Sequence, residues 1–151
     1  MLRHSRILIE GCRILDIPIV WLEQLPDKLG DTHPLIAEVL NGLSPIAKSS
    51  FSALGNDKFV KHIERNCRKQ IILSGIETHI CVYQTIKDLK SNFKIHVPFE
   101  TVGSRNPNNY ENGLDLIRDM GASVTNVETI LFDLIKTSEH SSFKVISKLI
   151  K

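Results

Sequence analysis

The sequence lacks the features that mark several large classes of protein. It has three cysteines in 151 residues, an odd number without a CxxC pair, which argues against a disulfide framework and a zinc ribbon. No apolar run comes near the roughly 18 residues that a membrane-spanning helix needs, and residues 1–6 do not lead into a secretory signal. We therefore expect a soluble, cytoplasmic protein without membrane contacts, whose cysteines are reduced thiols.

Charge of one sign is also lacking. The 19 basic and 17 acidic residues leave a net charge of +2 and are interspersed along the chain. Such a balance gives no strong field to attract nucleic acid or an anionic membrane surface. Glycine and proline number only 8 and 6, which excludes collagen-like and low-complexity chains, and 42% of the residues are hydrophobic. This composition predicts a single globular domain over residues 1–151.

What the sequence does contain is an alternation of helical and strand patterns. The predicted helices are 2–15, 32–42, a segment around 59–63, 78–89, 114–120, 127–135 and 138–150, and the predicted strands are 17–22, 70–74, 94–97 and 123–125. The segment 48–54 has no clear period and is predicted to be a loop. The alternation indicates an α/β fold with three layers, in which a Rossmann-like parallel sheet carries helices on both faces.

The chain opens with a helix rather than a strand. In a doubly wound sheet the opening strand is often central, and a helix with no strand before it is a crossover with only one end attached. We therefore expect the first strand of the sheet to be missing from this sequence.

Ligands of open parallel sheets bind just beyond the carboxyl ends of the strands. Cys81 is the most suggestive residue there, because it follows strand 70–74 and lies in the first turns of a helix, whose positive dipole end stabilises a thiolate. Position alone leaves two interpretations open, a nucleophile or an inert core cysteine. Cys12 and Cys67 have no catalytic context, so Cys81 is expected to be the most reactive thiol.

Motifs of other enzyme classes are missing. The sequence has no dinucleotide-binding glycine pattern, no P-loop and no serine hydrolase motif. None of the six histidines has the spacing of a metal ligand. We expect no cofactor and no metal.

A family resemblance then becomes visible around Cys81. The segment 74–85, SGIETHICVYQT, resembles the nucleophile segment of the isochorismatase-like cysteine hydrolases, especially the branch of isochorismatase-domain-containing proteins. The resemblance covers nearly the whole chain. It includes Glu23, Gln24, Leu29 and Gly30, then Lys48 with Phe51 and Ser52, then Ser104 and Arg105, and finally Gly121, Ala122, Thr125 and Glu128.

This resemblance implies a mechanism. The family hydrolyses C–N bonds through a thioester with an Asp, Lys and Cys triad, so Cys81 would attack a carbonyl carbon and Lys48 would favour its thiolate and help to place it. The backbone N–H groups of Glu77 and Cys81 would hold the oxyanion, and the peptide between Ile76 and Glu77 would be cis. The implied substrate is a small molecule, an amide or a related compound.

The departures from the family pattern limit the inference. The metal-binding nicotinamidases carry an Asp-x-His pair where this chain has Glu23 to Pro26, so no metal is expected. An aspartate often found after the third predicted strand is replaced by Glu100. The aspartate of the triad lies at the end of the missing first strand. We therefore expect little or no hydrolase activity from residues 1–151.

Three functions compete. The first is a cysteine hydrolase of this superfamily acting on a small amide. The alternative is a catalytically inactive, oligomer-forming relative that lacks the acid-base aspartate. A thiol redox protein is the weakest, because no resolving cysteine lies close in sequence to Cys81. A homo-oligomer is expected from the family and from an apolar stripe of Phe143, Ile146 and Ile150, which could instead pack on the sheet of its own chain.

Overall fold

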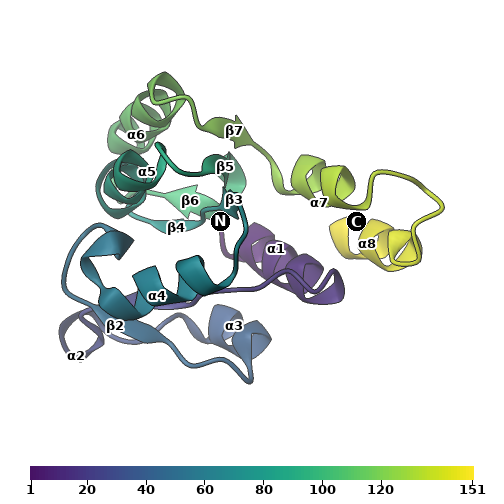
Figure 1. Cartoon of the computed structure of the whole chain (residues 1–151), viewed down its shortest axis with the longest axis horizontal. Helices are drawn as coiled ribbons and strands as arrows, with labels where there is room; N and C mark the ends of the chain where they lie inside the picture. Colours follow the sequence, from purple (N-terminus) through teal and green to yellow (C-terminus); the bar gives the residue numbers. More distant parts are fainter.

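The computed structural model describes residues 1–151 and has helices and strands in alternation (Figure 1). The α-helices are α1 (Leu2–Ile14), α2 (Pro26–Leu29), α3 (Pro34–Ala37), α4 (Asp57–Arg65), α5 (Tyr83–Leu89), α6 (Pro107–Asp119), α7 (Val127–Ile135) and α8 (Phe143–Ile150). The strands are β1 (Leu22–Gln24), β2 (Ile46–Lys48), β3 (Gln70–Ile72), β4 (Gly75–Ile76), β5 (Lys94–Pro98), β6 (Val102–Gly103) and β7 (Ser123–Thr125). Single turns η1 (Glu38–Leu40), η2 (Ala53–Gly55) and η4 (Phe99–Thr101) are 3-10 helical, and η3 (Thr78–Val82) is π-helical.

Every strand pair is parallel, which confirms the predicted α/β class with helices flanking parallel sheets. The strands form three groups, with the orders β1-β2, β3-β5-β7 and β4-β6. The predicted strand at 17–22 is wrong in its bounds, because pairing begins only at Leu22 and residues 17–21 are extended without a partner strand. Part of the predicted loop is also wrong, because Lys48 is the last residue of β2.

The sheet is interrupted between β1 and β3. β1 pairs only with β2, and β3 pairs only with β5, so each of them has one open edge. Just before β1, the backbone N–H groups of Ile19, Val20 and Trp21 donate to no backbone carbonyl. Ile19 and Ile72 both pack against one apolar cluster, so the segment before β1 and strand β3 help to cover the same cluster. Unpaired edge groups of this kind can receive a further strand.

Asparagine side chains start three of the longer helices. Asn56, Asn106 and Asn126 each accept hydrogen bonds from backbone N–H groups in the first turn of α4, α6 and α7. Gly121, with φ of 83°, follows α6 in the left-handed conformation that glycine adopts without a steric penalty.

The core consists of two apolar clusters. One joins α1, α7 and α8, and its buried residues are Ile7, Leu8, Cys12, Val127, Ile130, Leu131, Ile135 and Ile146. The other joins α5, α6 and β5, and includes Ile86, Ile95 and Ile117. Ile146 is fully buried in the first cluster, with Phe143 and Ile150 packed against it. The apolar stripe therefore packs within its own chain, on helices α1 and α7, and does not support self-association.

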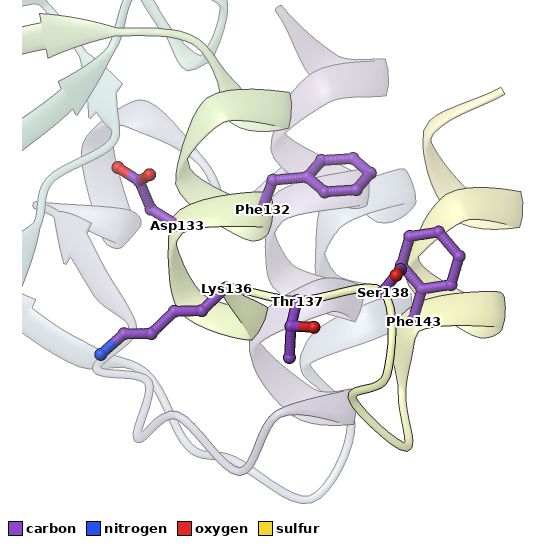
Figure 2. Close-up of a pocket in the computed structure, with 6 residues that line it drawn as sticks. All are labelled: Phe132, Asp133, Lys136, Thr137, Ser138 and Phe143. Atoms are coloured by element: carbon purple, nitrogen blue, oxygen red, sulfur yellow. The ribbon is translucent and has the colours of Figure 1, made fainter.

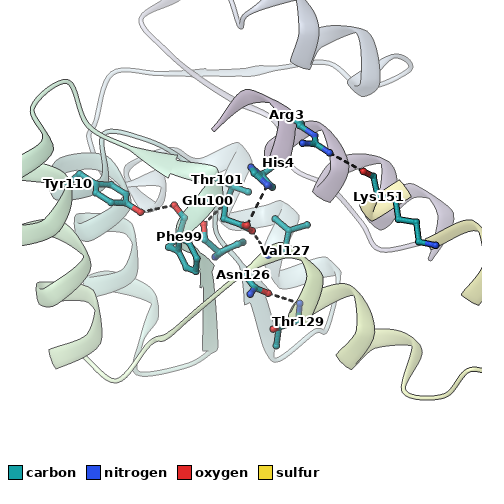
Figure 3. Close-up of polar contacts among 11 residues, drawn as sticks. Arg3, His4, Phe99, Glu100, Thr101, Tyr110, Asn126, Val127, Thr129 and Lys151 are labelled. Carbon is teal, nitrogen blue, oxygen red and sulfur yellow. Dashed lines mark hydrogen bonds and ion pairs between the residues drawn. The ribbon is translucent and has the colours of Figure 1, made fainter. Parts of the chain in front are cut away.

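Glu100 connects three elements (Figure 3). One of its carboxylate oxygens accepts a hydrogen bond of 2.8 Å from the N–H of Val127, at the start of α7. The other oxygen lies 3.4 Å from Nε2 of His4 on α1. A carboxylate at a helix N-terminus is stabilised by the helix dipole. The residue that replaces the family's aspartate here thus anchors α1 and α7 to the end of β5.

His96 gives the fold a pH dependence. Burial, followed by the nearby Lys94, lowers the pKa of this histidine, and Asp133 opposes the effect. The unfolded chain therefore binds a proton more readily than the folded chain. We expect the free energy of unfolding to fall as pH drops through about 6.5, the usual histidine value, until His96 is also protonated in the folded state.

Urea unfolding between pH 5 and 8 measures this effect. His96→Gln is expected to flatten the acid side of the stability curve, because it removes the imidazole whose pKa is lowered by folding. An identical acid slope in the His96 variant and the unaltered chain would contradict the assignment.

Candidate active site

The candidate site lies where β2 and β3 end. Cys81 is half-buried in the π-helical turn η3, which follows β3 and β4 and continues into α5. Lys48 is the last residue of β2. Burial lowers the pKa of Lys48, and the charge of the Cys81 thiolate acts in the opposite direction. The structure therefore brings these two predicted site residues within electrostatic range of each other.

The ammonium group of Lys48 has a full set of acceptors. It donates to Oε1 of Gln24, to the backbone oxygen of Ser50 at 2.8 Å and to that of Phe51 at 2.9 Å. An ammonium group has three N–H donors, so each has a partner. All three acceptors are neutral. The charge of Lys48 is consequently not cancelled by a carboxylate and is available to stabilise a thiolate.

Thr85 joins the lysine segment to the cysteine helix. Its Oγ1 accepts a hydrogen bond of 3.0 Å from the N–H of Ala53 and donates one of 2.7 Å to the carbonyl of Cys81. Nearby, Oγ of Ser52 donates to Asp88 on α5 at 2.6 Å. These bonds hold the chain after Lys48 against the turn after Cys81. The sequence analysis gave Thr85 no role, because nothing in a linear pattern shows this contact.

The segment before Cys81 has an unusual backbone. The peptide between Ile76 and Glu77 is cis, as the resemblance implied. The N–H of Glu77 donates no hydrogen bond within the chain, which leaves it free for an oxyanion. Thr78 is fully buried, and its Oγ1 has no hydrogen-bond partner. The neighbouring glycine of α6, Gly113, packs directly on Thr78 and His79.

Side chains of the next loop hold this segment. The carboxylate of Glu77 accepts a hydrogen bond of 2.8 Å from Nε of Arg105 and lies 3.7 Å from Nδ1 of His79. Nδ1 of His79 is also 2.9 Å from Oγ of Ser104. Together with the pairing of β4 and β6, these contacts fix the position of the nucleophile segment. They give Ser104 and Arg105, quoted above only for the resemblance, a defined structural role.

The other two cysteines have different surroundings. Cys12 is buried in the cluster of α1, α7 and α8, and burial raises its pKa to about 11. It is a thiol at neutral pH. Cys67 is exposed, with its backbone in the left-handed region at φ of 50°. Reagents can therefore reach Cys67. A test of whether Cys81 is the most reactive thiol requires a separate alkylation rate for each cysteine.

The structure has no metal-ligand cluster, and the cavity between α7 and α8 is separate from the predicted site residues. No group of three or more His, Cys, Asp or Glu side chains is arranged to hold a metal ion. A cavity of about 570 Å³ lies between α7 and α8 and is lined by Phe132, Asp133, Lys136, Thr137, Ser138 and Phe143 (Figure 2). None of the predicted site residues lines it. No helix combines the length and apolarity needed to span a bilayer.

Comparisons with known proteins identify the family of the chain. The isochorismatase domain family matches residues 1–129. Isochorismatase family protein 1A of Dictyostelium discoideum is 35% identical over 97% of this chain and 73% of that protein. The secreted isochorismatase effector Isc1 of Phytophthora sojae is 33% identical over 100% of this chain and 74% of that protein.

A solved structure shows the same fold. The MAR1 ribonuclease from Caenorhabditis elegans superposes with a TM-score of 0.91 at 35% sequence identity, over 98% of this chain and 77% of that one. The resemblance found around Cys81 is thereby confirmed at the level of the family. The chain belongs to the isochorismatase domain family.

Proposed function

We propose that the chain is a cysteine hydrolase that cleaves a carbon–nitrogen bond of a small amide, or a related carbonyl compound, through a thioester. The observation that carries this proposal is the environment of Lys48, a half-buried ammonium group within electrostatic range of Cys81 that donates only to neutral oxygens. The free N–H of Glu77, four residues before Cys81, adds an oxyanion donor. Thiolate, cation and N–H donor are the groups that acyl transfer to a cysteine requires.

The proposed reaction has two stages. The Cys81 thiolate attacks the carbonyl carbon, a carbon–sulfur bond forms, and the backbone N–H groups of Glu77 and Cys81 donate to the resulting oxyanion. The intermediate then collapses, the carbon–nitrogen bond breaks, and the amine leaves with a proton. Water attacks the thioester in the second stage, which releases the carboxylic acid and frees Cys81.

The leaving amine needs a proton donor, and the contacts of Lys48 do not supply one. The hydrogen-bond partners of Lys48 include no carboxylate. We propose that a strand added at the open edge of β1 or β3 supplies the acid-base carboxylate, because each of these edges can pair with a further strand. Loss of such a group typically slows turnover by about 10² to 10⁴-fold. The lack of a carboxylate among the partners of Lys48 also favours the second candidate, an inactive relative.

An activated ester tests the nucleophile and the oxyanion donors without the acid, and turnover of small amides then separates the two candidates. p-Nitrophenolate leaves without a proton, so acylation by p-nitrophenyl acetate needs the nucleophile and the oxyanion donors but no acid. For the hydrolase we expect a burst of nitrophenolate and an acetyl group on the Cys81 peptide by mass spectrometry, with slow turnover of small amides. Cys81→Ala should remove the burst.

Cys67→Ala is the matched control, because it deletes an exposed cysteine outside the site and should leave the burst intact. An inactive relative that lacks only the acid-base carboxylate would also be acetylated on Cys81, but its turnover of small amides would not exceed that of Cys81→Ala. A burst of equal size in Cys81→Ala would also refute the hydrolase.

Self-association and a cytoplasmic location are part of the same proposal. Support for self-association comes from exposed apolar side chains on α7 and α8, among them Phe132, Leu134 and Val145. Light scattering at micromolar concentration measures the assembly, and a mass of 17.1 kDa would correspond to a single chain and contradict it.

A further inference from the structure

Gln24 makes the side-chain contact that holds Lys48 in place. It is the last residue of β1 and lies opposite Lys48 in the parallel register, so both side chains leave the sheet on the same face. Its Oε1 accepts from Nζ of Lys48, and its Nε2 donates to the carbonyl of Ser49 at 2.7 Å. The remaining two acceptors of Lys48 are backbone carbonyls. Gln24 is thus the only side chain that binds this ammonium group.

We propose that Gln24 is a positioning residue for the reactive pair, which acts on Cys81 by orienting the Lys48 ammonium group without cancelling its charge. This inference rests on the proposed function, because it concerns the reactivity of the same cysteine.

The chemistry of the amide explains why glutamine suits this position. A neutral carbonyl oxygen stabilises a half-buried cation by a hydrogen bond. A carboxylate would do so more strongly, but its negative charge would offset the field of Lys48 at Cys81. The bond from Nε2 to Ser49 fixes which end of the amide faces Lys48, since the flipped amide would place N–H donors against an ammonium group.

The test is the pH profile of alkylation of Cys81 by iodoacetamide, followed by peptide mapping so that each thiol gives its own rate. Gln24→Met removes the acceptor at similar length, and Gln24→Glu keeps an acceptor but adds a charge. In both variants we expect the midpoint of Cys81 labelling to move up by about one pH unit, which makes labelling near neutral pH about tenfold slower. The rate at high pH, on the plateau of the Cys81 profile, should not change.

The unchanged rate at high pH distinguishes positioning from structural damage, because a distorted site would change the access of the reagent at every pH. Gln70→Met is the matched control. Gln70 also makes one side-chain hydrogen bond, to His96, but it is the first residue of β3, at the opposite end from the site, so the profile of Cys81 should stay the same.

Lys48→Met separates this inference from the proposed function. If Lys48→Met moves the midpoint and neither Gln24 variant does, the role of Gln24 is wrong while the reactive pair stands. If Lys48→Met has no effect on Cys81, the pair itself is wrong and the role of Gln24 is overturned with it. A faster Cys81 in Gln24→Glu would also overturn the inference.

Discussion

Replacing Gly113 with alanine is expected to destabilise the fold and to displace the segment that carries Cys81. A Cβ atom at Gly113 would lie 2.9 Å from the backbone N of His79, 2.9 Å from Cγ2 of Thr78 and 3.0 Å from its carbonyl carbon. Two of these atoms are backbone, so no side-chain rotation can relieve the contact. Overpacking of this kind costs about 1 to 3 kcal/mol, which outweighs the gain of up to about 1 kcal/mol from alanine in a helix.

Urea unfolding and the burst with p-nitrophenyl acetate measure the two effects of Gly113→Ala. The matched control is Asn112→Ala, because the neighbouring position on α6 is exposed and its change gains helix propensity without a new contact. We expect this control to be at least as stable as the unaltered chain. A Gly113→Ala chain with unchanged stability would show that α6 does not pack on the nucleophile segment as closely as described.

The largest loss of stability is expected for Leu131→Ala. Leu131 is fully buried in the cluster of α1, α7 and α8. Truncation of a buried leucine costs about 2 to 5 kcal/mol, since apolar burial is lost and a cavity remains. Differential scanning calorimetry or urea unfolding of the variant measures this loss directly.

Gly11 packs against Leu131, so the effects of changes at the two positions are expected to be coupled. A Cβ at Gly11 would lie 2.5 Å from Cδ2 and 2.9 Å from Cδ1 of Leu131, so Gly11→Ala alone should destabilise the chain. With Leu131→Ala present, the new methyl group enters the vacated space. We expect the double variant to be more stable than the sum of the single changes predicts, by about 0.5 to 3 kcal/mol. Additive effects would contradict the contact between α1 and α7.

The sequence predicts elements with a strong period better than it predicts short strands. The helices around 2–15 and 127–135 and the strand near 94–97 have apolar patterns long enough to identify. β4 and β6 contain two residues each, too few for any period. The run 17–22 is apolar and β-branched, but Pro18 has no N–H to donate and no strand lies beside most of the run.

In the candidate site, too, features set by local order could be predicted, whereas contacts between distant segments could not. The place of Cys81 could be predicted because it depends on local order, a strand followed by a helix. The link from Thr85 to Ala53 and the bond from Gln24 to Lys48 depend on which strands become neighbours and on their register. A single sequence contains no signal for such contacts, and the resemblance supplied the identities of Gln24, Lys48 and Thr85 without their contacts.

The interrupted sheet has a mechanical consequence for the site. Lys48 and Gln24 lie on the side of β1 and β2, whereas Cys81 follows β3, and no strand ladder connects the two sides. Separation of the two sides along this line breaks no ladder hydrogen bond, so apolar packing and side-chain hydrogen bonds oppose it. Lys48 and Cys81 therefore lie on opposite sides of this line. The hydrogen bonds from Ala53 to Thr85 and from Ser52 to Asp88 cross this line next to Lys48 and Cys81. They hold the segment after β2 against α5 at the candidate site.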